Sequence, residues 1–400
     1  MQTIYVEVEI PRVLLTRVLS KIWSGAYLSP ISPVHFVTQP DPPLSEPYSV
    51  RVRNRLSLIC GTDLHLVHAD GDPRVAPAIL PGNKRTYLGH ELCGEVIEVG
   101  DAVTRVHPGD RVALRYFSPT CRTQGIEPLC RHCQRGDYYL CENQSANLKR
   151  TSVGGGWSDQ LLVHEDQLYR PPDMLSDEEV ALLEPAAVGV HAVLQALPNP
   201  GDHVLVLGCG IIGLMTVQAL RALAPEAHVT ALARYPFQAE AARRLGAHEV
   251  RTRADGYAVT AEITGARLYR GMLGSTMALG GFDIVYDCVG TGRTVTDTLR
   301  WARAGGTVVL VGVQFKPLTV DLSPVWYQEV RLIGTMAHGI EQWCGEEVET
   351  FELTARLFQA GKLTAEGLIT HRFPLSRWRE AIEVATAKRQ HQAIKVAFTF

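Results

Sequence analysis

The sequence contains no run of about 18 uncharged apolar residues, the length that a helix needs to cross a bilayer. It has no excess of positive charge either: its formal net charge is −3, which gives no electrostatic footprint for nucleic acid or an anionic membrane. Residues 1–10 lack the basic and apolar regions of a secretion signal, and their alternation of apolar residues with Glu predicts a strand instead. No internal repeat or low-complexity tract is present. What remains is the composition of an ordinary globular enzyme.

Cysteine is present in an odd number, nine, and four of these residues crowd between positions 121 and 141. A disulfide framework uses paired cysteines in an oxidising compartment, whereas a tight cluster suits a metal site in a reducing one. We therefore expect a cytoplasmic protein in which this cluster binds a metal ion.

The pattern of short apolar runs divides the chain. Residues 1–187 contain such runs between Pro- and Gly-rich turns, which is typical of β structure with many loops. In residues 188–338, predicted strands at 204–207, 228–232, 282–287, 306–311 and 330–334 alternate with helices, the clearest at 211–223 and 238–245. Residues 339–400 predict helices at 347–360 and 376–387 and strands at 369–373 and 393–400. The segment 251–280 has no clear period.

Apolar strands that alternate with helices predict a parallel sheet covered on both faces. The predicted fold is therefore α/β, with an open doubly wound domain at residues 188–338 inserted into a β-rich domain made of residues 1–187 and 339–400. Residues 10–43 form an unusually long entry to the first domain. Their aromatic residues predict either a cover over that domain or a subunit contact.

Three glycines predict a dinucleotide-binding loop between a strand and a helix: Gly208, Gly210 and Gly213, the last preceded by Ile211 and Ile212. In such a loop the first glycine permits a tight turn, the second lets the backbone approach the pyrophosphate, and the third allows the helix to pack closely on the strand. The helix N-terminus favours the phosphate charge. We therefore expect a dinucleotide cofactor here.

The end of the second strand in this domain bears on which cofactor is used. An NAD site places Asp or Glu there, about 20 residues past the last glycine, to bind the ribose hydroxyls. Here Ala233 occupies that place and Arg234 follows it. No carboxylate repels a 2′-phosphate, and a guanidinium can bind one through two parallel hydrogen bonds. We predict a preference for NADP(H); if Arg234 is only a solvated charge, the cofactor is NAD(H).

A separate set of residues offers ligands for a catalytic metal. The candidates are Cys60, followed by Thr62, Asp63 and His65, then the pair His90-Glu91, and Glu184. Zinc binds Cys sulfur, His nitrogen and carboxylate oxygen, and catalytic sites leave one position open. Isolated cysteines are more often packed core residues, which is our interpretation of Cys93, Cys209, Cys288 and Cys344.

These motifs together resemble those of the zinc-dependent medium-chain alcohol dehydrogenases, over nearly the whole chain. Cys60-Gly61-Thr62-Asp63-Leu64-His65 resembles the catalytic-cysteine motif, Gly89-His90-Glu91 the second-ligand motif, and Leu183-Glu184-Pro185 the segment with the third ligand. In the ethanol-type branch the third ligand is Cys, whereas in the polyol, threonine and sugar branches it is Glu, as here. The resemblance implies a GroES-like fold for the β-rich domain and a Rossmann fold for residues 188–338.

The resemblance also implies a metal centre. Cys60, His90 and Glu184 would bind Zn²⁺, and Glu91 would either bind it directly or tune it from behind the ligands. A metal-bound alcohol loses its proton readily because the cation stabilises the oxyanion. Asp63 would either orient a ligand or cap a helix.

For the reaction itself, the resemblance implies hydride transfer between an alcohol carbon and nicotinamide. The hydroxyl of Thr62 would take the alcohol proton and pass it through the cofactor ribose toward His65, which would release it to solvent. An imidazole suits this role because such groups ordinarily exchange protons near neutral pH. His65 as an ordinary surface histidine is the alternative. Val289 and Val311 would contact the cofactor.

The cluster of four cysteines matches the family's structural zinc lobe only in part. Cys130, Cys133 and Cys141 have the spacing of its last three ligands, but the place of the first, three residues before Cys130, holds Glu127. An insertion after Cys121 would leave that cysteine to complete a four-cysteine site. Glu127 as an oxygen ligand, or loss of the metal, are the alternatives.

Two other functions fit the fold. Zinc-independent quinone or enoyl reductases share it but lack the ligands, and a non-enzymatic cofactor-binding scaffold would keep the ligands without turnover. Glu184 favours a polyol or sugar-like alcohol, whose pocket we expect between residues 66 and 87 and at Trp157 and Trp326. The resemblance implies a homodimer or homotetramer paired through strands around residues 305–320.

Overall fold

The computed structural model describes residues 1–76, 85–144 and 152–400, and divides them into two compact units. The first unit is Met1–Glu184 with Ala365–Phe400, and the second is Pro185–Thr364. The chain therefore returns from the second unit to the first after residue 364, rather than after residue 338 as predicted. Residues 339–364 join the second unit because they bond to its helices: Thr364 and Gln218 exchange two hydrogen bonds of 2.8 and 3.2 Å, and His191 lies 2.5 Å from Glu341.

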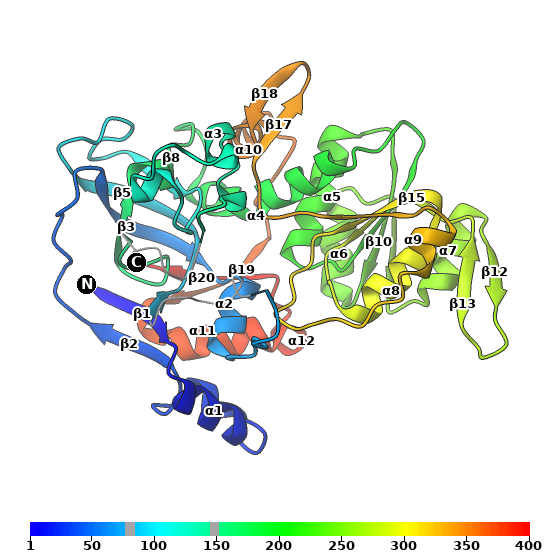
Figure 1. Cartoon of the computed structure of the whole chain (residues 1–400), viewed down its shortest axis with the longest axis horizontal. Coiled ribbons are helices and arrows are strands. Elements are labelled where there is room, and N and C mark those ends of the chain that lie inside the picture. Colours follow the sequence, from blue (N-terminus) through cyan, green and yellow to red (C-terminus); the bar gives the residue numbers. More distant parts are fainter. Residues whose placement is uncertain (77–84, 145–151) are drawn as a thin grey trace. The chain divides into compact units, whose positions relative to one another are not determined.

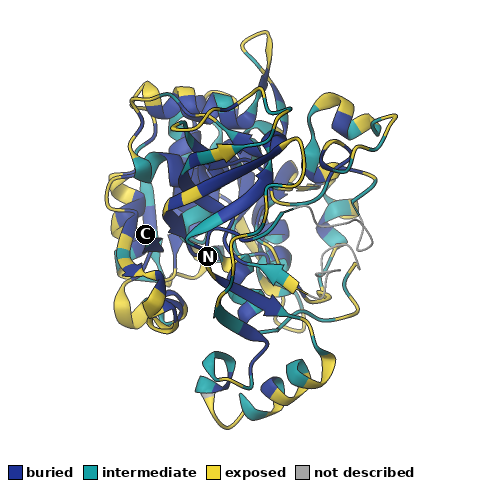
Figure 2. Ribbon diagram, turned by 90° about the vertical axis from the view of Figure 1, so that its left-hand side faces the viewer, coloured by how far each residue is buried: buried dark blue, intermediate teal, exposed yellow. Residues whose placement is uncertain are grey.

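The main sheet of the first unit has seven strands in the order β19-β20-β3-β5-β6-β8, with β7 paired to β3. Every pair is antiparallel except β19–β20. The sheet is largely buried, as Figure 2 shows, which agrees with the predicted β-rich domain. Its strands are β3 (Ser49–Leu58), β5 (Glu91–Val99), β6 (Arg111–Leu114), β7 (Gln160–His164), β8 (Leu168–Tyr169), β19 (Ile369–Pro374) and β20 (Lys395–Thr399).

Short helices complete this unit. They are α2 (Gly61–Val67), α3 (Arg131–Arg135), α11 (Trp378–Thr386) and α12 (Lys388–His391), with single 3₁₀ turns η1 (Ser24–Leu28), η3 (Arg122–Gln124), η4 (Tyr138–Leu140), η5 (Glu165–Gln167) and η6 (Leu375–Arg377). Helix α4 (Asp177–Gln195) contains the boundary between the units. Among the described residues, no helix has both the length and the apolar content that a membrane span requires.

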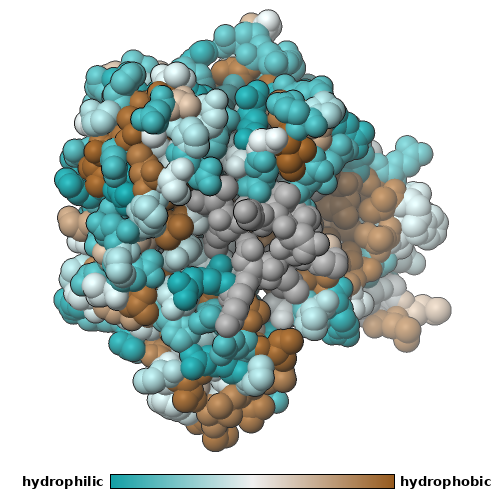
Figure 3. Space-filling model, turned by 60° about the vertical axis from the view of Figure 1, so that its left-hand side comes forward, coloured by the Kyte–Doolittle hydropathy of each residue, from teal (hydrophilic) through white to brown (hydrophobic). Residues whose placement is uncertain are grey.

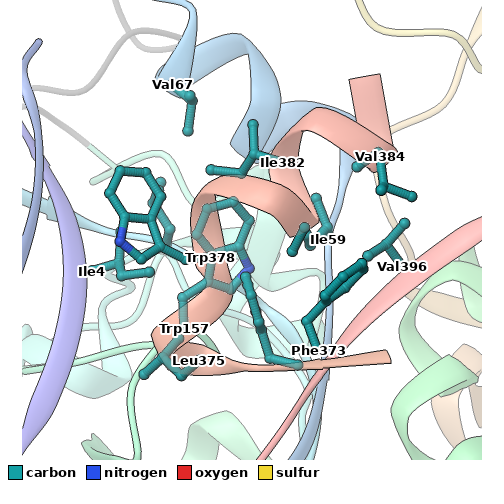
Figure 4. Close-up of a cluster of buried hydrophobic side chains, with 14 of the residues drawn as sticks. Ile4, Ile59, Val67, Trp157, Phe373, Leu375, Trp378, Ile382, Val384 and Val396 are labelled. Atoms are coloured by element: carbon teal, nitrogen blue, oxygen red, sulfur yellow. The ribbon is translucent and has the colours of Figure 1, made fainter. Parts of the chain in front are cut away.

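A core of aliphatic and aromatic side chains packs between α11 and the neighbouring strands (Figure 4). Trp157 and Trp378 are almost fully buried there, and the Trp157 ring meets Phe398 at 5.3 Å between centroids. Sequence reasoning placed Trp157 in a substrate pocket, and this is wrong, because its ring has no exposed surface. Of the predicted pocket segment 66–87, residues 77–84 lie outside the described residues.

The first residues of the chain form a small sheet and a helix whose apolar side chains face outward while a polar one is buried. Strand β1 (Gln2–Glu7) pairs with β2 (Val34–Thr38) and β4 (Arg85–Tyr87), and helix α1 (Ile10–Leu19) projects beyond them (Figure 1). In α1 the buried residue is Thr16, whereas Ile10 and Val18 are 71% and 62% exposed. Apolar side chains accordingly gather at the lower end of Figure 3.

The second unit is built on a six-stranded parallel sheet in the order β11-β10-β9-β14-β15-β16. Numbered along the chain, this is the order 3-2-1-4-5-6 of doubly wound dinucleotide-binding domains, as predicted. The strands are β9 (His203–Leu207), β10 (His228–Ala233), β11 (Glu249–Thr252), β14 (Phe282–Asp287), β15 (Ala302–Leu310) and β16 (Arg331–Gly334). The helices are α5 (Ile211–Leu223), α6 (Pro236–Arg244), α7 (Gly256–Thr264), α8 (Gly292–Trp301), α9 (Ser323–Tyr327) and α10 (Thr350–Gln359).

Two hairpins in this unit differ from the sequence expectation. The unassigned segment 251–280 contains, after α7, the hairpin β12 (Arg267–Arg270)–β13 (Thr276–Leu279). The predicted helix at 347–360 begins only at residue 350, because β18 (Glu346–Glu349) pairs with β17 (Ile340–Trp343). Pairing with a neighbouring strand overrides the helical propensity of the glutamates there.

Candidate functional site

Cys60 stands at the N-terminus of α2, and Asp63 holds it there. The backbone N–H of Cys60 donates to Oδ2 of Asp63 at 3.1 Å, so the carboxylate satisfies one of the free N–H groups at the helix start. The other oxygen, Oδ1, accepts from the N–H of Gly89 at 3.0 Å and lies 3.7 Å from Nδ1 of His90. Asp63 therefore both caps the helix and connects Cys60 with His90, which were the two alternatives left by the sequence.

Cys60, His90 and Glu91 form the first of two groups with metal-binding geometry among the described residues. One ligand atom from each lies within 4.8 Å of the others. Sulfur, imidazole nitrogen and carboxylate oxygen are the donors that zinc prefers, and three protein ligands leave a position for substrate. The donor set and its spacing thus fit a catalytic zinc ion. Thr62 lies beside it, with Oγ1 3.4 Å from Nε2 of His90.

Glu91 is also paired with a lysine that the sequence analysis did not single out. Nζ of Lys395, on β20, donates to Oε1 at 2.7 Å and lies 2.6 Å from Oε2. Oε2 is buried in ion-pair contact with the same ammonium, but among the described residues no group donates a well-directed hydrogen bond to it. Oε2 is therefore the oxygen with lone-pair capacity left for a metal ion, while the Lys395 ammonium donates to Oε1 and balances the charge of the carboxylate.

Glu184 lies close to this group but is not part of it. Burial raises the pKa of Glu184 to about 7, and the charge of His90 opposes the rise while that of Glu91 adds to it. Because the charges of His90 and Glu91 act on the Glu184 carboxyl, the three residues share one electrostatic environment. The structure thus brings Cys60, His90 and Glu91 together and leaves Glu184 at the margin, buried in the interior of α4.

His65 lies on α2, one turn and a half after Cys60, and its partner is Asp70. Nδ1 of His65 is 2.9 Å from both carboxylate oxygens of Asp70. The imidazole is 28% exposed and the carboxylate 31%, so the pair is open to water. A histidine with one nitrogen fixed by a carboxylate is suited to carry protons to and from solvent.

The four clustered cysteines form the second metal-binding group, as their crowding predicts. Cys121, Cys130, Cys133 and Cys141 each bring a sulfur within 4.8 Å of the others, and all nine cysteines are free of disulfides. Backbone N–H groups donate to two of the sulfurs, at 3.5 Å to Cys121 and 3.4 Å to Cys130. Glu127 is exposed and outside the group. Cys121, rather than Glu127, completes a tetrad that fits zinc.

Aromatic rings link this lobe to the first group. The ring of Phe117 lies 4.8 Å from that of His90, and the ring of Tyr139 lies 6.0 Å from Phe117 at an angle of 70°. Tyr139 belongs to η4, just before Cys141. The folding of the cysteine lobe therefore affects the packing beside His90.

The dinucleotide loop has the backbone that its glycines predict. Gly208 adopts a φ of +93°, which side chains other than glycine's rarely allow. A Cβ on Gly213 would stand 1.8 Å from the carbonyl oxygen of Gly208, whereas a Cβ on Gly210 would meet nothing within 4 Å. The first contact shows why helix and strand can pack so closely, and the open space at Gly210 is where a pyrophosphate can approach. Ile211 and Ile212 open α5 behind it.

The edge of the sheet beyond this loop carries the remaining predicted cofactor residues. Ala233 is buried at the end of β10, and Arg234 after it is exposed, with its guanidinium 5.4 Å from the ring of Tyr235. Arg253, which sequence reasoning missed, is also exposed and donates to the carbonyl of Arg234. Two cations therefore stand where an NAD site has a carboxylate.

Val289 and Val311 follow the carboxyl ends of β14 and β15. The side chain of Val289 lies against Gly208, since a Cβ there would approach its Cγ2 to 2.5 Å. The N–H of Val311 donates to the carbonyl of Asp287. Both residues thus lie at the edge of the parallel sheet where this fold binds its ligands.

Comparisons with known proteins show to which family the chain belongs. Residues 46–173 match the alcohol dehydrogenase GroES-like domain, and residues 212–352 match the zinc-binding dehydrogenase family. The chain is 33% identical to an L-idonate 5-dehydrogenase of Vitis vinifera and 31% identical to a sorbitol dehydrogenase of Arabidopsis thaliana, in each case over 88% of both chains.

A solved structure shares the fold over most of its length. It is a zinc-binding dehydrogenase from Sinorhizobium meliloti with NADP bound, 29% identical, with a TM-score of 0.69 and coverage of 92% of this chain and 95% of that one.

Proposed function

We infer the reaction from the family to which this chain belongs, the zinc-dependent medium-chain alcohol dehydrogenases of the polyol branch. As an alcohol dehydrogenase it transfers hydride between an alcohol carbon and a nicotinamide cofactor. We propose that its substrates are secondary or primary alcohols with several hydroxyls, and that it uses NADP(H). The observation that carries the chemistry is the group Cys60, His90 and Glu91, whose donor atoms lie within 4.8 Å of one another.

We propose that Cys60 and His90 hold the catalytic zinc, and that the carboxylates Glu91 and Glu184 share the remaining protein position. When bound there, zinc stabilises the negative charge that develops on the substrate oxygen. Asp63 fixes the position of Cys60 relative to His90, because its Oδ2 accepts from the N–H of Cys60 and its Oδ1 accepts from the N–H of Gly89, next to His90. Lys395 pairs with the buried carboxylate of Glu91 and offsets its negative charge.

The proton of the alcohol leaves along Thr62 and His65 in this proposal. The Thr62 hydroxyl lies at the metal group, 3.4 Å from His90. His65 is partly exposed and hydrogen-bonded to Asp70, so its imidazole can pass a proton to water. The cofactor ribose would join the two residues.

The preference for NADP(H) rests on Arg234 and Arg253. Both are exposed beside Ala233, the place where an NAD site needs a carboxylate. The solved structure of the similar dehydrogenase from Sinorhizobium meliloti has NADP bound, which supports the proposed preference for NADP(H).

The preference for polyhydroxy alcohols rests on the relatives, which are named idonate and sorbitol dehydrogenases. We propose that the chain assembles as a homodimer or homotetramer, and that the cysteine tetrad binds a second, structural zinc.

The test is oxidation of a panel of sugar acids, sugar alcohols, threonine and simple alcohols, with NADP⁺ and NAD⁺ side by side, on protein of known zinc content. Turnover of a polyhydroxy substrate with NADP⁺ would support the proposal. Turnover of simple alcohols alone, with NAD⁺, would leave the family chemistry and remove both refinements.

A further inference from the structure

Arg17, on the N-terminal helix α1, binds the loop that follows α2. Its Nε donates to the carbonyl of Ala69 at 2.5 Å, and its Nη2 donates to the carbonyl of Gly71 at 2.7 Å. These carbonyls flank Asp70, so one guanidinium holds the backbone on both sides of that residue. A planar fork of donors can span two acceptors in this way, whereas the single ammonium of a lysine is a point charge without that geometry.

The loop needs such a restraint because its backbone is strained. Ala69 has a φ of +48°, in the left-handed region that residues with a Cβ rarely adopt. It stands where α2 ends, with the N–H of Ala69 bonded to Leu66 and that of Asp70 bonded to His65. Strained residues persist only where the surrounding structure fixes them, and the bond from Arg17 to the carbonyl of Ala69 is one such contact.

Asp70 in turn determines the state of His65. Both of its oxygens lie 2.9 Å from Nδ1 of the imidazole. An ionised carboxylate only accepts, so Nδ1 carries the proton and Nε2 is the nitrogen that can receive another. The carboxylate also stabilises the imidazolium that forms when Nε2 is protonated, until that proton passes to water.

We propose that Arg17 is a positioning residue for proton release: it fixes Asp70 through the carbonyls on either side, and Asp70 fixes the tautomer and orientation of His65. This rests on the role of His65 under the proposed function. It gives Arg17, within residues 10–43, a part in the reaction, while the cover or subunit contact expected of that segment stays a prediction. Arg17 precedes residue 46, where the match to the family begins, so the motifs of the family do not include it.

The first test compares Arg17→Gln and Arg17→Lys with Arg12→Gln. Arg12 is a matched control, because it also anchors α1 through polar contacts, to the carbonyl of Ser32 and to His35, but does not touch the loop. We expect kcat for alcohol oxidation at pH 7 to fall about tenfold in both Arg17 variants, with KM for alcohol and cofactor within about twofold. Arg12→Gln should match the wild type in kcat. Equal losses in Arg12→Gln and Arg17→Gln would overturn the proposal in favour of a general effect of α1.

A double-mutant cycle then asks whether Arg17 acts through His65. If it does, Arg17→Gln has no further effect on kcat in a His65→Ala background, because there is no imidazole left to position. If the double variant instead lost kcat by the product of the two single losses, Arg17 would act independently of His65 and the proposal would be overturned. Failure of the proposed function gives a different result: the wild type oxidises no alcohol, or His65→Ala is as fast as the wild type.

A third measurement does not depend on turnover. The ¹⁵N shifts of the imidazole nitrogens report the tautomer of each histidine, and the signal of His65 is the one that disappears in His65→Ala. We expect a single tautomer protonated on Nδ1 in the wild type and a mixture in Arg17→Gln and Asp70→Asn. An unchanged tautomer in Arg17→Gln would contradict the proposal even if the variant were slow.

Discussion

Lys395 and Glu91 form a buried ion pair in which the ammonium lies 2.7 and 2.6 Å from the two carboxylate oxygens, with 3% and 0% of the side chains exposed. The pair sits directly beside the donor atoms of Cys60 and His90. Its charge balance therefore bears on both folding and metal binding.

Lys395→Met should lower the free energy of unfolding by about 3–5 kcal/mol, because it leaves the Glu91 carboxylate buried without a counterion. Urea denaturation measures the loss. The second substitution in Lys395→Met/Glu91→Gln should recover much of it, since no charge then remains to be paired. Lys362→Met, at an exposed lysine, should stay within about 0.5 kcal/mol of the wild type. A Lys395→Met protein as stable as this control would contradict the pair's importance.

Metal-free protein should lose stability as the pH rises from about 4.5 to about 7, partly through Glu184. Burial raises the pKa of this carboxyl from its ordinary value of 4.5 to about 7 in the folded chain. In this window the folded state keeps a proton that the unfolded state has lost, so unfolding becomes easier as the pH rises. The contribution is roughly 3 kcal/mol across the window. Chelator-treated wild type and Glu184→Gln should therefore converge at pH 4.5 and diverge at pH 7, with the variant the more stable; parallel profiles would contradict this.

Gly210→Ala and Gly213→Ala should fail in different ways. The new methyl at residue 213 would collide with the carbonyl of Gly208 at 1.8 Å, so this variant should unfold at a lower temperature. At residue 210 the methyl meets no protein atom, so the melting temperature should stay unchanged while cofactor affinity falls about tenfold or more. Calorimetry and cofactor titration separate the two effects. Unimpaired cofactor binding in Gly210→Ala would show that the pyrophosphate lies elsewhere.

Arg234→Ala should weaken NADP⁺ binding about 10- to 100-fold, which is the loss of one charge-assisted hydrogen-bonding partner. NAD⁺ binding should change less than about twofold, because it lacks the 2′-phosphate. Arg253→Ala, at the neighbouring arginine, should act in the same direction. The two dissociation constants, measured by fluorescence titration, decide the matter; an unchanged ratio would point to NAD(H) as the cofactor.

Cys121→Ser should reduce the zinc content from two ions per chain to one and lower the melting temperature by roughly 5 °C or more, since the metal closes a lobe with little apolar core. Cys344→Ser is the control and should alter neither, because Cys344 lies outside both groups and is exposed, contrary to its interpretation as a core residue. Glu127→Gln should also leave the zinc content at two. Loss of zinc from Glu127→Gln but not from Cys121→Ser would reverse the assignment.

Local patterns predicted most of the cofactor unit. The helix 211–223 was placed at its observed bounds, because its apolar spacing, its glycines and the strand before it all indicate the same element. Helix α4 was missed: its first part, residues 177–187, lies in a segment interpreted as β, although Ser176 and Glu179 exchange the hydrogen bonds of a capping box at its start. That signal is readable in the sequence.

The partners of the site residues were harder to predict. Lys395 reaches Glu91 from 304 positions away, and no spacing rule connects a last strand with a motif near the start. Asp70 lies five residues from His65, but its contact depends on the left-handed backbone of Ala69, for which alanine gives no signal. The cysteine tetrad was predictable despite its insertion because four thiols have few other reasons to cluster in a reducing compartment.

The first unit is discontinuous in sequence. Strand β20, which carries Lys395, pairs with β3, although the whole second unit lies between these two strands along the chain. During synthesis, the proposed metal ligand Glu91 is therefore made 304 residues before its counterion Lys395. The second unit, continuous from 185 to 364, can fold in that interval. Until strand β20 is made, Glu91 stands beside Cys60 and His90 without its counterion. The proposed catalytic centre is thus completed only at the end of synthesis. Zinc that bound earlier would meet a Glu91 carboxylate not yet paired with Lys395.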